Sequence, residues 1–156
     1  GRRGAEALRS FVLGGGRLVA VEAAAGFVID LLDLPVRNVV AGRPETEFHI
    51  PGSILRLELD PASPLARGLD REGVAWFWRS SMAFRADSPS VRVAARYGSG
   101  DPLLSGWAVG GDEIAGEPAL LEAEVGAGSV VLFGFQPNYR GQSVATWPLL
   151  FNALTP

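Results

Sequence analysis

The sequence predicts one α/β domain built around a mixed β-sheet. Two observations favour this class: helix-like and strand-like hydrophobic patterns alternate near the start of the chain, and two apolar strands joined by a glycine-rich turn lie near its end. The length of 156 residues and the apolar fraction of 47% are typical of one folded domain. We therefore expect residues 1–156 to form a single domain.

The first elements are predicted to be a helix, a strand and a second helix. Residues 5–13 carry apolar side chains at helical spacing, and the glycines at 14–16 end that helix. Residues 17–21 are apolar and predict a strand that is buried on both faces. Residues 24–32 predict the second helix, whose inward-facing residues are expected to be Phe27, Val28, Leu31 and Leu32.

The rest of the chain is predicted to be mainly strands. A connection rich in proline and glycine occupies residues 35–52. Strands are then expected at 53–60, 74–84 and 91–98. A β-hairpin is expected at 119–135, followed by a final helix at 143–154 with Pro148 in its first turn. We expect the central strands of the sheet to be parallel.

Charge and composition exclude several classes of function. The net charge of −3 is not that of a basic nucleic-acid binder, and the most apolar segment, residues 18–32, is interrupted by charged residues and too short to span a bilayer. Without a cysteine, the chain has no disulfide, no thiolate metal ligand and no thiol nucleophile. We therefore expect no nucleic-acid partner and no membrane partner.

The usual signatures of hydrolytic enzymes are missing from the sequence. His49 is the sole histidine, so a zinc site with two or three histidines cannot form, and no G-x-S-x-G motif presents a serine nucleophile. Carboxylates occur at period two in predicted strands, at Glu58/Asp60 and Glu122/Glu124, but solvated strand faces explain them equally well. We predict no metal site and no catalytic residue in this chain.

Two segments are predicted to follow strands at one end of the sheet: the corner Glu22–Gly26 and the polar segment Gln136–Ser143. Ligands in open α/β sheets collect at the carboxyl ends of strands, so we expect a crevice between these segments. The candidate ligand-binding residues are Glu22, Gln136, Asn138, Tyr139, Arg140, Gln142 and Ser143. Two alternatives stay open: the polar residues cap the last helix, or Glu22 pairs with Arg140 and fills the crevice.

An aromatic row lies in the predicted strand at 74–84. Trp76 and Trp78 fall on one face of this strand, and Phe77 falls on the other. Such a row either packs in the core or offers a flat surface to a sugar or to a protein partner. The sequence favours the core and leaves the ligand platform as the alternative.

Several longer stretches resemble a known group of proteins. Together, "GGGRLVAVEAAAGFVIDLLDLPVRNV", "PGSILRLELDPASPLARGL", "ARYGSGDPLLSGW" and "GSVVLFGFQPNYRGQSVATWPLLFNAL" are similar to the C-terminal region of large bacterial zinc carboxypeptidases, the carboxypeptidase A-like metallopeptidases. The resemblance covers residues 5–154 and departs at Ser63, where a histidine is expected before "PLA". It implies a flavodoxin-like, class I glutamine amidotransferase-like three-layer sandwich that lacks the first βα units.

The resemblance also implies what this chain has lost. An active class I amidotransferase carries G-x-C-x-G at the strand-to-helix corner and H-P-E after a late strand. The comparison places Ala24 at the cysteine position and Gln136 and Asn138 at the histidine and glutamate positions, so amidotransfer is not expected.

The expected function is therefore that of a non-catalytic accessory domain of a secreted or periplasmic zinc carboxypeptidase. Its partner is expected to be the catalytic domain of the same polypeptide, and the zinc belongs to that domain. This chain itself is expected to hold no cofactor. The alternative is a module that binds a small ligand, a glycan or a cell-wall peptide.

Overall fold

The computed structural model describes residues 1–155, which form three α-helices, four short 3₁₀ turns and nine strands. The helices are α1 (Arg2–Leu13), α2 (Ala23–Leu32) and α3 (Trp147–Leu154). The strands are β1 (Arg17–Val21), β2 (Val36–Asn38), β3 (Ser53–Leu59), β4 (Glu72–Phe77), β5 (Phe84–Ala86), β6 (Val91–Tyr97), β7 (Leu103–Ser105), β8 (Pro118–Val125) and β9 (Gly128–Phe133). Most of the predicted elements are therefore present, with boundaries shifted by a few residues.

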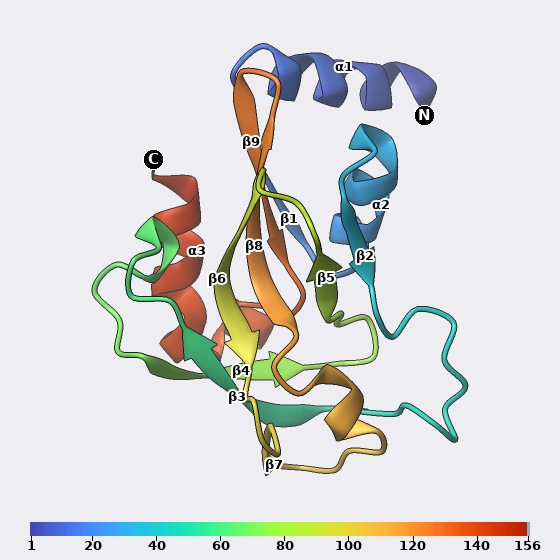
Figure 1. The fold of residues 1–156 in the computed structure, drawn as a ribbon, viewed down its shortest axis with the longest axis vertical. Coiled ribbons are helices and arrows are strands. Elements are labelled where there is room, and N and C mark those ends of the chain that lie inside the picture. The colour runs from blue at the N-terminus through green and yellow to red at the C-terminus, as the bar shows by residue number, and fades with distance from the viewer. Residues whose placement is uncertain (156) are drawn as a thin grey trace.

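A mixed sheet forms the central layer, in the order β1-β9-β8-β6-β3-β4, with β7 paired to β3 (Figure 1). One face is covered by α2 and by the small β2–β5 sheet, which bury Val28, Leu32 and Phe84. The opposite face is covered by α3 and a 3₁₀ turn, which bury Leu149 and Leu65. The fold is thus the predicted flavodoxin-like, amidotransferase-like three-layer arrangement.

Fewer strands of the sheet run parallel than we expected. Of the described strand pairs, β1 and β9 run parallel, and the pairs at the centre of the sheet are antiparallel. Strand β1 is also an edge strand whose residues are mostly half-buried, so the prediction that it is buried on both faces is wrong. The parallel β1–β9 pair does place the ends of both strands side by side, as the site prediction requires.

Two local predictions also differ from the structure. Phe27 faces solvent, with 51% of its surface exposed, because the inward face of α2 is formed by Ala25, Val28 and Leu32. The expected strand at 74–84 is interrupted by a turn, so β4 and β5 belong to different sheets.

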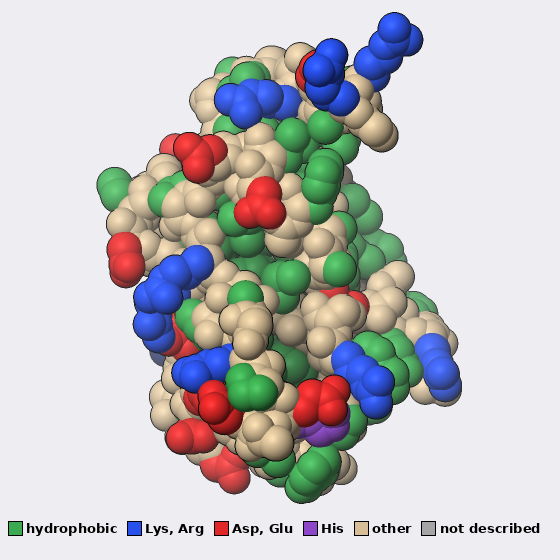
Figure 2. Space-filling model, turned by 90° about the vertical axis from the view of Figure 1, so that its right-hand side faces the viewer, with side chains coloured by type: hydrophobic (Ala, Val, Ile, Leu, Met, Phe, Trp, Pro, Cys, Tyr) green, Lys and Arg blue, Asp and Glu red, His purple; other side chains and the backbone are tan. Residues whose placement is uncertain are grey.

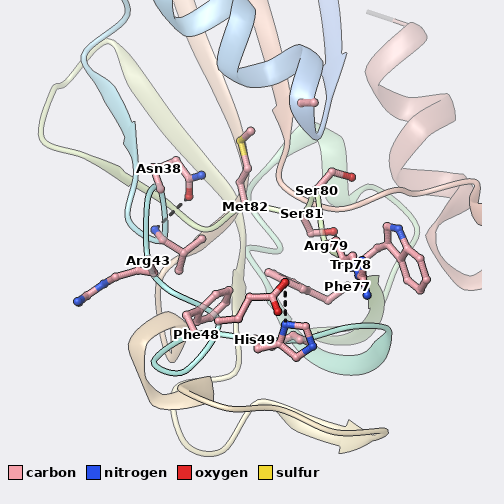
Figure 3. Close-up of a pocket in the computed structure, with 15 residues that line it drawn as sticks. Asn38, Arg43, Phe48, His49, Phe77, Trp78, Arg79, Ser80, Ser81 and Met82 are labelled. Atoms are coloured by element: carbon pink, nitrogen blue, oxygen red, sulfur yellow. Dashed lines mark hydrogen bonds and ion pairs between the residues drawn. The ribbon is translucent and has the colours of Figure 1, made fainter.

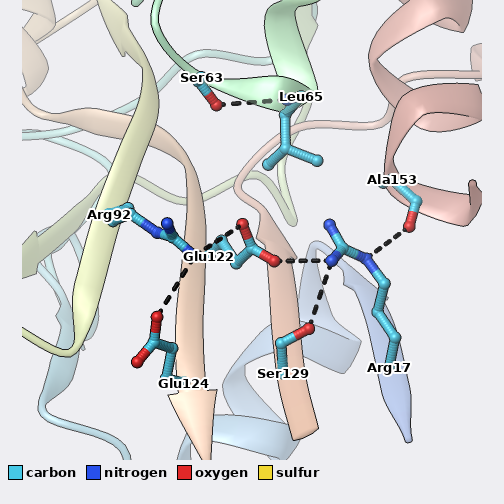
Figure 4. Close-up of polar contacts among 8 residues, drawn as sticks. All are labelled: Arg17, Ser63, Leu65, Arg92, Glu122, Glu124, Ser129 and Ala153. Carbon is cyan, nitrogen blue, oxygen red and sulfur yellow. Dashed lines mark hydrogen bonds and ion pairs between the residues drawn. The ribbon is translucent and has the colours of Figure 1, made fainter. Parts of the chain in front are cut away.

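Other predictions are confirmed. Gly14 caps the end of α1, the β8–β9 hairpin turns at Gly126–Ala127, and Pro148 lies in the first turn of α3. Ser63, where the resemblance expects a histidine, accepts a hydrogen bond from the Leu65 N–H at 3.3 Å and so caps a 3₁₀ turn (Figure 4).

The surface carries charges of both signs. On the face shown in Figure 2, acidic and basic side chains are interspersed with apolar ones. Among residues 1–155, no helix combines the length and the apolar character needed to cross a membrane.

Candidate functional site

The strand-to-helix corner between β1 and α2 is centred on Glu22. Its backbone has φ 49° and ψ −123°, a left-handed conformation that is rare for a residue other than glycine. The Glu22 N–H donates to the Phe133 carbonyl at 2.8 Å, and the Glu22 carbonyl accepts from the Ala25 N–H at 2.7 Å. These two bonds hold a conformation that costs about 1–3 kcal/mol.

This geometry corrects the comparison made from sequence. Hydrolytic α/β folds place the nucleophile on the strained residue of such a corner. Here that residue is Glu22, whereas Ala24 lies inside the first turn of α2. The strained residue therefore lies two positions before Ala24, the residue that the comparison with the G-x-C-x-G motif places at the cysteine position.

The Glu22 side chain is buried, and each of its carboxylate oxygens accepts a hydrogen bond. It is 9% exposed, and its carboxylate accepts hydrogen bonds from Ser81 Oγ at 2.6 Å and from Ser80 Oγ at 2.9 Å. Burial, and to a smaller degree the Glu22 carboxylate, raises the pKa of the Tyr97 hydroxyl well above its usual range. That hydroxyl stays protonated and donates to the Met82 carbonyl at 2.8 Å.

The two serines belong to a tight turn at residues 78–81. Its ends are joined twice: the Ser81 N–H donates to the Trp78 carbonyl at 2.9 Å, and the Trp78 N–H donates to Ser81 Oγ at 2.9 Å. Ser81 Oγ also donates to Glu22, so the corner carboxylate fixes the turn that carries Trp78 and Arg79. Glu22 is thus linked through hydrogen bonds to the position of these two side chains.

A cavity of about 400 Å³ lies beside this turn and reaches Ala23 at the start of α2. Figure 3 shows Asn38 and Arg43 across the cavity from Trp78 and Arg79, with Phe48 and His49 below and Met82 above. The cavity lies next to the end of β1, which agrees with the position expected for ligand sites in α/β sheets.

The second predicted segment, 136–143, does not join this cavity. Tyr139, Gln142 and Ser143 line a different cavity of about 310 Å³, together with Trp76 and Val144. The two segments therefore lie at the same end of the sheet without forming one crevice, and the single site predicted from sequence is wrong in this respect.

The polar side chains of segment 136–143 are used differently from the prediction. Ser143 donates to the Pro137 carbonyl at 2.9 Å, so it bonds the loop backbone and does not cap α3, whose N-terminus has no side-chain cap. The Arg140 guanidinium lies over the ring of its neighbour Tyr139, with Cζ 5.3 Å from the ring centroid. Glu22 binds the two serines rather than Arg140. Gln136 is half-buried, while Asn138 and Gln142 are exposed.

The aromatic row is confirmed as a row, with a third ring added to it. The Trp76 ring stacks on Trp78, with centroids 6.1 Å apart, and on Tyr139, with centroids 4.8 Å apart. Phe77 lies in the core on the other face. Tyr139 thus covers Trp76, while Trp78 remains 37% exposed and lines the 400 Å³ cavity. The row is neither a core face nor a fully open platform.

Gly52 makes room for this stack, so we expect Gly52→Ala to disturb it. Gly52 has φ +152°, and an added Cβ would lie 2.8 Å from Trp78 Cζ3 and 3.1 Å from Trp76 Cζ2. The free energy of unfolding should fall by about 1–3 kcal/mol, and the near-UV circular dichroism of the tryptophans should change. Gly100→Ala is the matched control, because an added Cβ there meets nothing within 4 Å. Unchanged spectrum and stability in Gly52→Ala would contradict the close packing.

His49 and the paired carboxylates take structural positions. His49 lines the cavity, with Nδ1 at 3.8 Å from the Glu45 carboxylate. Glu58 accepts hydrogen bonds from the N–H and the hydroxyl of Ser99, which lower its pKa. Glu122 is buried in an ion pair with Arg17. In the described part of the chain, no three side chains of the metal-binding types converge on one point.

Sequence reasoning missed the turn residues Arg79, Ser80 and Ser81. A signal was present, because "RSS" places three polar residues inside an otherwise apolar run expected to be a strand. That break indicates a turn, but it does not show that the serines reach Glu22, which lies 58 and 59 residues away in the sequence.

No family model and no curated protein gives a significant match to this chain. Three solved structures are similar in fold. A β-galactosidase from Bacillus circulans sp. alkalophilus has a TM-score of 0.60 and 16% identity over 96% of this chain and 20% of its own. A ThuA-like protein from Bacteroides uniformis has a TM-score of 0.54 and 14% identity over 96% of this chain and 61% of its own. A GMP synthase subunit from Thermoplasma acidophilum has a TM-score of 0.59 and 10% identity over 98% of this chain and 63% of its own.

At these identities, the likeness shows the fold and no more. This chain spans less than two thirds of each of these structures. The fold neighbours agree with the amidotransferase-like, flavodoxin-like architecture predicted from the sequence.

Proposed function

We propose that this chain is a non-catalytic accessory domain of a bacterial zinc carboxypeptidase, and that it packs against or positions the catalytic domain of the same polypeptide. The proposal that the domain is non-catalytic rests on the position of Glu22. It occupies the strained corner residue, and both of its carboxylate oxygens accept hydrogen bonds from serine hydroxyls. A carboxylate held in this way anchors a turn and is poorly placed to attack a substrate.

The chemistry of an amidotransferase is absent from the corresponding positions. The sequence has no cysteine, and the residues that follow β9 are Gln136, Pro137 and Asn138, none of which acts as a general base near neutral pH. Glutamine hydrolysis by a thiol nucleophile is therefore not a function of this chain.

The link to a zinc carboxypeptidase rests on the sequence resemblance. The fold comparison adds that a domain of this shape accounts for 20% of a larger enzyme chain, the β-galactosidase. In this proposal the catalytic domain binds the zinc, and the present chain contributes no ligand to it. Secretion or a periplasmic location follows from the same proposal.

The test is to express the full polypeptide that contains this domain, with and without it, and to measure zinc-dependent release of C-terminal residues from peptides. We expect turnover in the catalytic part and lower thermal stability when the domain is deleted. The isolated chain should show no carboxypeptidase and no glutaminase turnover beyond a heat-denatured control. Turnover by the isolated chain, or a full polypeptide without a zinc-binding H-x-x-E motif, would overturn the proposal.

A further inference from the structure

The cavity beside Trp78 contains hydrogen-bond donors that the protein does not use. Within residues 1–155, Arg79 has no ion-pair partner and its guanidinium makes no hydrogen bond to another residue. Asn38 accepts from the Val40 N–H at 3.2 Å through Oδ1, and its amide N–H groups have no partner in the same part of the chain. Both residues line the cavity (Figure 3). Both side chains can therefore donate to a ligand that accepts hydrogen bonds.

Three other charged or ionisable side chains line the cavity: Arg43, Glu45 and His49. The Glu45 carboxylate is 80% exposed and lies 3.8 Å from His49 Nδ1. Arg43 pairs with Glu113 at 2.8 Å and with Glu47 at 3.2 Å. Glu22 lies behind Ser80 and Ser81, and both hydroxyls donate to it. Of the two arginines that line the cavity, Arg79 is consequently the one without an acidic partner in the described residues, and its planar fork of donors matches a carboxylate.

The cavity also has an apolar part whose side chains are held in place. Phe48 packs edge-on against Phe77 at 6.0 Å, and Ile50 is buried beside them. Trp78 is fixed by its stack on Trp76 and by the close approach of Gly52, so its exposed surface is already oriented before a ligand arrives. A volume of about 400 Å³ is near the lower end of the range for small-molecule sites.

We propose that this cavity binds a small organic carboxylate with an apolar, ring-sized body. The carboxylate binds the Arg79 guanidinium, and the ring lies against Trp78 above the apolar floor. This proposal is independent of the accessory role, because it rests on the cavity alone.

Phenylacetate is a suitable probe, because phenylacetamide has the same shape without the charge and acetate has the charge without the ring. We expect calorimetry to show phenylacetate binding in the millimolar range, with phenylacetamide and acetate each at least about tenfold weaker. Arg79→Gln should remove the preference for phenylacetate over phenylacetamide. Arg67→Gln is the matched control, because Arg67 is exposed and does not line this cavity.

Each outcome decides one part of the proposal. No measurable binding of phenylacetate at millimolar concentrations would overturn it, as would equal affinity for phenylacetate and phenylacetamide. Unchanged phenylacetate affinity in Arg79→Gln would remove Arg79 from the site. D-glucuronate binding more tightly than phenylacetate would overturn the apolar body of the ligand. Circular dichroism of Arg79→Gln, matched to that of the parent chain, ensures that a loss of binding is not a loss of fold.

Discussion

Replacing Glu22 by alanine is expected to lower the free energy of unfolding by about 3 kcal/mol. The change removes two hydrogen bonds to a charged group, each worth about 1.5–3 kcal/mol, and leaves the buried Ser81 hydroxyl without its acceptor. Alanine also keeps the unfavourable left-handed backbone, so no strain is released to offset the loss. Urea unfolding monitored by tryptophan fluorescence measures the change.

Further variants separate the charge from the shape of this side chain. Glu22→Gln should cost less than Glu22→Ala, because the amide keeps one acceptor for the two serines. A double-mutant cycle between Glu22→Ala and Ser81→Ala, in which each single change removes the Ser81–Glu22 hydrogen bond, should give a coupling energy of about 1–3 kcal/mol. Glu124→Gln, on an exposed side chain, is the matched control. Additive effects of the Glu22 and Ser81 changes would show that the 2.6 Å contact does not anchor the turn.

Replacing Arg17 by leucine is expected to cost about 3 kcal/mol. Arg17 Nη1 lies 2.7 Å from Glu122 Oε1, and its Nε donates to the Ala153 carbonyl at the end of α3 at 2.8 Å (Figure 4). The Glu122 side chain is 9% exposed, so the variant leaves a buried carboxylate whose remaining ion-pair partner is the longer contact to the exposed Arg92, at 3.7 Å. Removing the close partner of a buried charge is strongly destabilising, and α3 also loses a donor to its last turn.

The control for Arg17 is a surface ion pair with the same chemistry. Arg56 and Glu72 are 3.1 Å apart and 40% and 74% exposed, so Arg56→Leu should cost at most about 1 kcal/mol. The double variant Arg17→Leu/Glu122→Leu should regain most of the lost stability, because it removes both charges at once. Equal losses in Arg17→Leu and Arg56→Leu would contradict the buried role of the Arg17–Glu122 pair.

Local sequence determined much of the fold, because the responsible signals are local. Gly14 ends α1 where the helical pattern stops, Gly126 allows the hairpin turn with φ 61°, and Pro148 fits the first turn of α3, where a missing N–H costs little. The absence of a thiol nucleophile is also read locally, since the chain contains no cysteine. The three-layer fold was predicted from the resemblance to the zinc carboxypeptidase region.

The candidate site was decided by contacts between distant parts of the chain. Which residue of the corner carries the positive φ depends on the bond between the Glu22 N–H and Phe133, which forms only when β1 pairs with β9. Ser80 and Ser81 reach Glu22 because the chain leaves the sheet after β4 and returns as β5 in a separate sheet. Hydrophobic period shows which face of an element is buried, but strand order decides which polar side chains meet. For this protein, the sequence therefore determined the elements and the absence of a thiol nucleophile, and the tertiary structure alone placed Glu22, Trp78 and Arg79 around one turn.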